Sequence, residues 1–155
     1  MVNQDKIEST LGYKFTSSAL LTEALEAAGR AYTHDDTEGG MDGNKRLAMV
    51  GDALLTLIHF DMWYPSGQSR ETAENSRQKY TSNVNLEKCA EEFGIKSEIL
   101  LSAGDSARRT VAKVTSASTV EALLGAVWLD SSKNFDKVKD VAFNLGIAKN
   151  YVILE

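Results

Sequence analysis

The chain has 155 residues, a formal net charge of −5 and a single cysteine, Cys89. One cysteine excludes an internal disulfide and indicates a reducing compartment. The negative net charge argues against a surface built throughout to bind nucleic acid, although a local basic face remains compatible with it. No apolar run reaches the roughly 18 residues of a membrane span, and residues 1–15 have the pattern of neither a signal nor a transit peptide. We therefore expect one intracellular domain over residues 1–155, in the cytoplasm or nucleus.

The apolar residues recur almost everywhere at the spacing of a helix, and no segment alternates with the period of a strand. The sequence therefore predicts an all-α fold. Two polar stretches, residues 29–43 and 103–116, are predicted to be loops. In chain order, helices are predicted around residues 7–11, 17–28, 44–63, 69–81, 83–93, 96–101 (a short turn), 117–130 and 135–145.

The predicted helix from Asn44 to Trp63 is the longest in the chain. Leu47, Leu54 and their neighbours make it apolar on most sides, which is typical of a buried central helix. Its length is about 30 Å at 1.5 Å per residue. Asn44 is expected to cap the start of this helix, and Pro65 follows its end.

Two of the predicted helices carry one carboxylate each on a face of small residues. In the central helix, Asp52 lies four residues after Ala48, and in the later helix, Glu121 lies three residues after Ser118. If the two helices cross there, Asp52 and Glu121 converge, and one of them must take a proton or both must bind a cation such as magnesium. Periodicity alone leaves open the alternative that each acid is simply solvated on its own helix.

Three motifs in chain order resemble those of the ribonuclease III family. The stretch Asn44–Leu55 resembles the family signature Asn-Glu-x-Leu-Glu-Phe-Leu-Gly-Asp, which opens a long helix. Ser118–Asp130 resembles the second family motif, Asp-x-x-Glu-Ala-x-x-Gly-Ala-x-x-x-Asp, and Leu11–Phe15 is similar to the Leu-Gly-Tyr-x-Phe opening of the same domain. The resemblance covers about residues 7–146. It implies the ribonuclease III endonuclease-domain fold, a helical bundle around a long central helix.

The resemblance also implies a catalytic site, and here the chain departs from the family. The four acids of the family site fall on Ala48, Asp52, Ser118 and Glu121, so that two of them are replaced, and another signature glutamate falls on Lys45. Two interpretations remain open. In one, Asp52 and Glu121 still hold a Mg²⁺ or Mn²⁺ ion and support slow phosphodiester hydrolysis. In the other, Lys45 pairs with one of these acids and the domain is catalytically inactive.

The family resemblance further implies a symmetric dimer that holds double-stranded RNA between its subunits. Met49 stands where the family has a phenylalanine that enters a socket on the partner, so we expect it at a homodimer contact, with plain core packing as the alternative. Basic side chains would hold the RNA phosphates. The candidates are Arg70, Arg77 and Lys79 on one helix, and Arg108, Arg109 and Lys113 in the loop before Ser118.

A second function is compatible with the same residues. It is a non-catalytic RNA-binding or dimerisation scaffold that acts with an RNA assembly or with an active relative. The 155 residues contain no recognisable double-stranded-RNA-binding domain, so RNA binding is expected to be weak and sensitive to salt. Among the acids of the long loop, Asp42 is the candidate for a replacement metal ligand, and His59 is expected to be a core or interface residue.

Overall fold

The structure is a computed structural model that describes residues 2–148, and within this range all the regular elements are helices, joined by turns and loops. The predicted all-α class is confirmed. Extended pairing among the described residues is limited to one isolated bridge between Glu26 and Leu100. The helices are α1 (Gln4–Leu11), α2 (Ser18–Leu25), α3 (Lys45–Trp63), α4 (Arg70–Tyr80), α5 (Asn83–Glu92), α6 (Ala103–Arg108), α7 (Lys113–Asp130) and α8 (Phe135–Asn144), with short 3₁₀ turns at η1 (Arg30–Tyr32), η2 (Gly40–Asp42), η3 (Tyr64–Ser66) and η4 (Lys96–Glu98).

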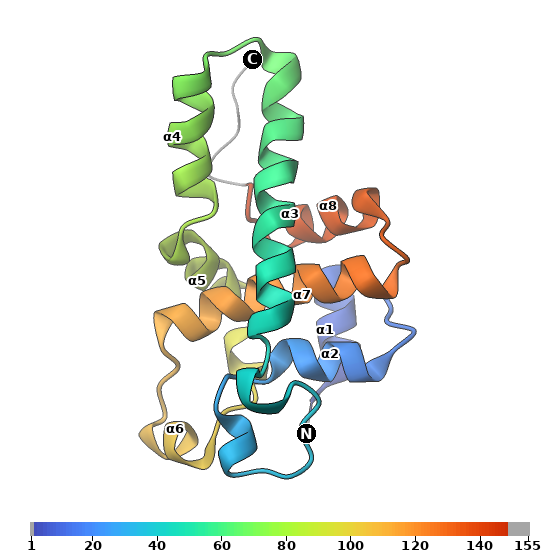
Figure 1. The fold of residues 1–155 in the computed structure, drawn as a ribbon, viewed down its shortest axis with the longest axis vertical. Helices are drawn as coiled ribbons and strands as arrows, with labels where there is room; N and C mark the ends of the chain where they lie inside the picture. Colours follow the sequence, from blue (N-terminus) through green and yellow to red (C-terminus); the bar gives the residue numbers. More distant parts are fainter. Residues whose placement is uncertain (1, 149–155) are drawn as a thin grey trace.

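Helices α3 and α7 cross at the centre of the molecule (Figure 1). Helix α7 also packs against α2, α5 and α8, and it is buried along more of its length than α3. Two glycines lie at the crossing. A Cβ atom at Gly51 would overlap the carbonyl oxygen of Glu121, and one at Gly125 would overlap that of Leu47. The two helix backbones therefore touch, and any larger residue at either glycine would push them apart.

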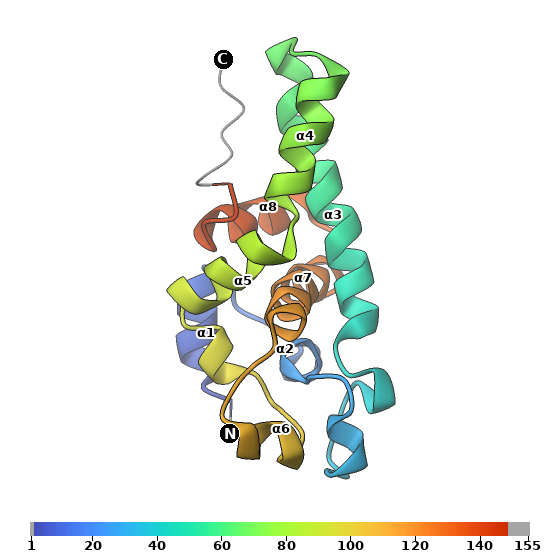
Figure 2. The ribbon, with the colours of Figure 1, turned by 90° about the vertical axis from the view of Figure 1, so that its left-hand side faces the viewer.

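Helix α3 continues beyond the bundle, and α4 returns beside it to form a projecting arm (Figure 2). The turn at its tip contains Pro65 and Gly67, and Gly67 has a left-handed backbone conformation. At the other end of α3, Asn44 does not cap the helix as predicted. Its side chain is buried and donates hydrogen bonds to the carbonyl of Ala24 (2.9 Å) and to Oγ1 of Thr119 (3.0 Å). Asn44 therefore ties the start of α3 to both α2 and α7.

The prediction was wrong at the end of α2 and in the segment before α7. Helix α2 ends at Leu25, because Leu25 and Ala27 exchange backbone hydrogen bonds with Leu100, and this pairing needs an extended chain. The predicted loop 103–116 contains the short helix α6, which Ser102 caps through a bond from the amide of Asp105. The end of α2 depends on pairing with the distant Leu100, and α6 is a single short capped helix. Neither feature produces an apolar pattern in the sequence that would predict it.

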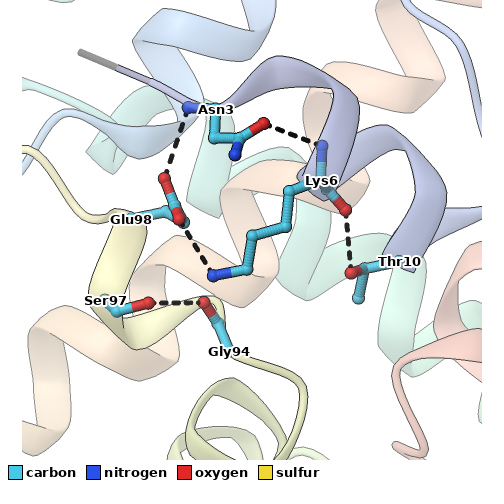
Figure 3. Close-up of polar contacts among 6 residues, drawn as sticks. All are labelled: Asn3, Lys6, Thr10, Gly94, Ser97 and Glu98. Carbon is cyan, nitrogen blue, oxygen red and sulfur yellow. Dashed lines mark hydrogen bonds and ion pairs between the residues drawn. The ribbon is translucent and has the colours of Figure 1, made fainter.

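One carboxylate links the start of the N-terminal helix to η4 (Figure 3). Glu98 of η4 accepts hydrogen bonds from the backbone amide of Asn3 (3.3 Å) and from Nζ of Lys6 (3.0 Å). The bond from Lys6 is the main reason why the pKa of Glu98 lies below its usual value. Among residues 2–148, no helix has the length and apolarity needed to cross a membrane.

Candidate functional site

The crossing of α3 and α7 brings Asp52 and Glu121 to the same place. Asp52 follows Gly51 on α3, and Gly51 rests on the backbone of Glu121 itself. Asp52 is exposed and Glu121 is partly buried. Burial, followed by the negative charge of Asp52, raises the pKa of Glu121 to about 7, while the positive charge of Lys45 partly opposes this rise. The two carboxylates therefore lie close enough to repel each other across the helix crossing.

Lys45 reaches across the same crossing from the first turn of α3. Its Nζ atom donates a hydrogen bond of 2.7 Å to Oγ of Ser118 on α7. Ala48 lies one turn after Lys45, and both Ala48 and Ser118 are almost fully buried. The two positions at which the sequence lacks an expected acid are thus filled by a methyl group and by a hydroxyl that binds the lysine. Sequence reasoning considered Lys45 as a partner for Asp52 or Glu121 and did not consider Ser118.

The site has only two carboxylates, Asp52 and Glu121, that could bind a metal ion. Within residues 2–148, no group of three or more His, Cys, Asp or Glu side chains could hold a metal ion. Asp42 is exposed on η2 and belongs to no such group, so the structure does not bring it in as a replacement ligand. Two repelling carboxylates with an ammonium group beside them do not fit a divalent cation well, because the ammonium already offsets one negative charge.

The family model described as Ribonuclease-III-like matches residues 19–145. The chain belongs to the ribonuclease-III-like family. Among similar proteins, ribonuclease 3 of Fusobacterium nucleatum is 30% identical over 98% of this chain and 64% of its own length. Ribonuclease 3 of Shewanella denitrificans is 29% identical over 84% of this chain and 55% of its own length. The chain thus spans somewhat more than half the length of these relatives.

Solved structures of the ribonuclease III nuclease domain from Campylobacter jejuni have the same fold. One superposes with a TM-score of 0.80 at 24% identity and covers 97% of this chain and all of that domain. This structure concerns flexibility in a region involved in dimer formation of the Campylobacter protein. A second structure of the domain has a TM-score of 0.78, also at 24% identity, and both chains are covered completely. The likeness confirms the fold that the sequence motifs predicted.

The first basic group of this ribonuclease-III-like domain lies along α4, and one of its members, Arg77, lies near Asp52. Arg77 donates a hydrogen bond to Glu74, and this bond is the main reason why the pKa of Arg77 is raised. The negative charge of Asp52 also raises the pKa of Arg77. Arg77 is therefore within electrostatic reach of Asp52. Arg70 lines a cavity of about 710 Å³ between α3 and α4, and Lys79 is exposed near the end of α4.

The second basic group is divided by the structure. Lys113 is exposed on the first turn of α7, whereas Arg108 and Arg109 lie at the end of α6. Arg108 forms an ion pair of 3.6 Å with Asp105 of its own helix. Arg109 has a left-handed backbone conformation and lines a cavity of about 590 Å³ together with Lys96. Sequence reasoning missed Lys96, because it comes from a distant turn and gives no motif.

Met49 lies on the outer side of α3. Its side chain is 77% exposed, and Leu57 (52%) and Tyr64 (79%) are exposed on the same side of the helix and the turn that follows it. This exposure excludes the alternative that Met49 packs in the core. His59, in contrast, is fully buried, and its Nε2 atom bonds to the carbonyl of Ala73 (3.0 Å).

Proposed function

We propose that this ribonuclease-III-like domain engages double-stranded RNA and that its metal-dependent phosphodiester hydrolysis is weak or absent. The observation that carries the proposal is the bond from Lys45 to Ser118, beside the converging carboxylates of Asp52 and Glu121. Membership of the family supports a role in RNA binding. The loss of two acids and the gain of an ammonium group support the loss of rapid catalysis.

Any Mg²⁺ or Mn²⁺ ion would be held by Asp52 and Glu121. The fit is poor, because Ala48 offers no ligand and Ser118 already accepts the bond from Lys45. Changes to residues that merely support metal ligands reduce affinity or activity by roughly 10–100-fold. Replacement of two ligands is expected to cost at least as much for each, which leaves slow hydrolysis or none.

Double-stranded RNA would be recognised through its shape and phosphates, as is usual for RNA duplexes. The basic residues of α4 support this proposal, because Arg77 lies within electrostatic reach of Asp52. Lys113 would contribute from the start of α7. With a net charge of −5, the chain depends on these local groups, and duplex binding is expected to weaken steeply with salt.

We also propose that two copies form a homodimer through the outer side of α3. Met49, Leu57 and Tyr64 form an exposed apolar stripe along that side. Stripes of this kind on a domain surface mark protein contacts. The flexible dimer region addressed in the Campylobacter structure supports this proposal by analogy.

The proposal is tested with a long labelled RNA duplex, measured for both binding and cleavage in the presence of Mg²⁺ or Mn²⁺. We expect binding at low salt, with cleavage that is slow or undetectable. Any cleavage that does occur should disappear in Glu121→Gln. Rapid cleavage that depends on Glu121 would contradict the loss of catalysis, and absence of duplex binding at low salt would contradict the RNA-binding role.

The exposed stripe of α3 favours a second candidate function, a non-catalytic scaffold that pairs with an active relative. The two candidates differ in what the purified domain does alone. The scaffold predicts stable association with the relative and no affinity for duplex RNA. Our main proposal predicts RNA binding by the isolated homodimer.

A further inference from the structure

Three replaced positions at the helix crossing act together as one structural unit. Lys45 supplies the long side chain, and Ala48, one turn later on the same face, supplies the space that an acid would fill. Ser118 supplies the oxygen that fixes the end of the lysine, at 2.7 Å. An acid at position 48 would compete for this lysine, and an acid at position 118 would neutralise it.

The bond to Ser118 leaves Lys45 charged and available. An ammonium group has three donors, and a hydroxyl acceptor uses one of them without cancelling the positive charge. Within residues 2–148, no carboxylate forms an ion pair with Lys45 at 4.0 Å or less. The side chain is only partly buried, so that solvent or a ligand can reach it.

Lys45 lies beside the two carboxylates that would hold a metal ion. Lys45 is bonded to Ser118, which lies one turn before Glu121 on the same face of α7, and Asp52 follows Gly51, which rests on the backbone of Glu121. A bound metal ion usually bridges such acids to a phosphate. A lysine binds phosphate as a compact point charge, and it can fill this role without a metal.

We propose that the ammonium group of Lys45 binds a phosphate of the RNA backbone at this site, so that RNA binds there without a divalent cation. The inference rests on the proposed engagement of double-stranded RNA and adds its point of contact. At this site, a lysine held by Ser118 takes the place of the cation that the missing acids would have recruited.

The test measures the affinity for a labelled RNA duplex over a range of NaCl concentrations, with EDTA or with Mg²⁺ at matched ionic strength. The wild-type domain is expected to bind equally well in both. Lys45→Met should weaken binding by about tenfold at low salt. The slope of the logarithm of the binding constant against the logarithm of the NaCl concentration should become shallower by about 0.9 for each Lys45 that contacts a phosphate. Lys45→Arg keeps the charge and should keep the slope.

Lys14→Met is the matched control, because Lys14 is exposed in the loop between α1 and α2, away from both basic groups. It should change neither affinity nor slope, and circular dichroism should show that all variants are folded. Wild-type binding that is lost in EDTA, or an unchanged slope in Lys45→Met, would overturn the inference while leaving RNA binding intact. A wild-type domain that binds no duplex at low salt would instead overturn the proposed function.

Discussion

The fold changes the charge state of Glu121 near neutral pH. Burial and the charge of Asp52 raise its pKa from 4.5 to about 7. The folded state therefore holds this proton more tightly than the unfolded state. The proton on Glu121 contributes fully to the free energy of unfolding below about pH 4.5, and this contribution is lost as the pH rises through about 7.

Replacement of Glu121 by glutamine should remove this pH dependence. We expect Glu121→Gln to be more stable than the wild type at pH 8, by on the order of 1–3 kcal/mol, because no charge is then buried beside Asp52. The advantage should shrink toward pH 4.5. Urea unfolding of both proteins at several pH values measures the difference, and parallel stability curves would show that Glu121 titrates normally.

The contact between Lys45 and Ser118 shows what the sequence could not predict at this scale. The two residues are 73 positions apart, and their bond exists only because α3 and α7 touch. The acids themselves were predictable, because Asp52 and Glu121 stand in motifs with helical spacing. The partner of the lysine depends on the exact distance between two backbones, which no periodicity encodes.

Among the elements, the crossing of α3 and α7 controls the geometry of the site. Its cause is the pair Gly51 and Gly125, each of which faces a carbonyl oxygen of the other helix. The end of α3 was predicted closely from Pro65, which stops a helix by its own chemistry, and the predicted helix 135–145 matches α8. The end of α2 could not be predicted in this way, since it is set by pairing with Leu100.

The glycine contact leads to a prediction with an internal control. Gly51→Ala should destabilise the domain by about 1–3 kcal/mol, because its methyl group would overlap the backbone of Glu121. Gly104→Ala in α6 meets no atom within 4 Å and should be neutral or stabilising by up to about 1 kcal/mol. Thermal and urea unfolding compare the two, and equal effects would contradict a close crossing.

For the whole molecule, motif order and spacing were sufficient to predict the fold. The likeness to the Campylobacter nuclease domain, with a TM-score of 0.80, confirms it. Net charge was less informative, because the basic groups on α4, α6 and α7 are distributed over an acidic chain.

The central proposal is that Lys45, Ala48 and Ser118 together limit hydrolysis in this ribonuclease-III-like domain. The most direct measurement is cleavage of a labelled RNA duplex with Mg²⁺ by the triple variant Lys45→Glu, Ala48→Glu, Ser118→Asp. We expect cleavage at least about 100-fold faster than that of the wild type, and its loss when Asp52→Asn is added. A folded triple variant that binds RNA but cuts no faster than the wild type would contradict the claim.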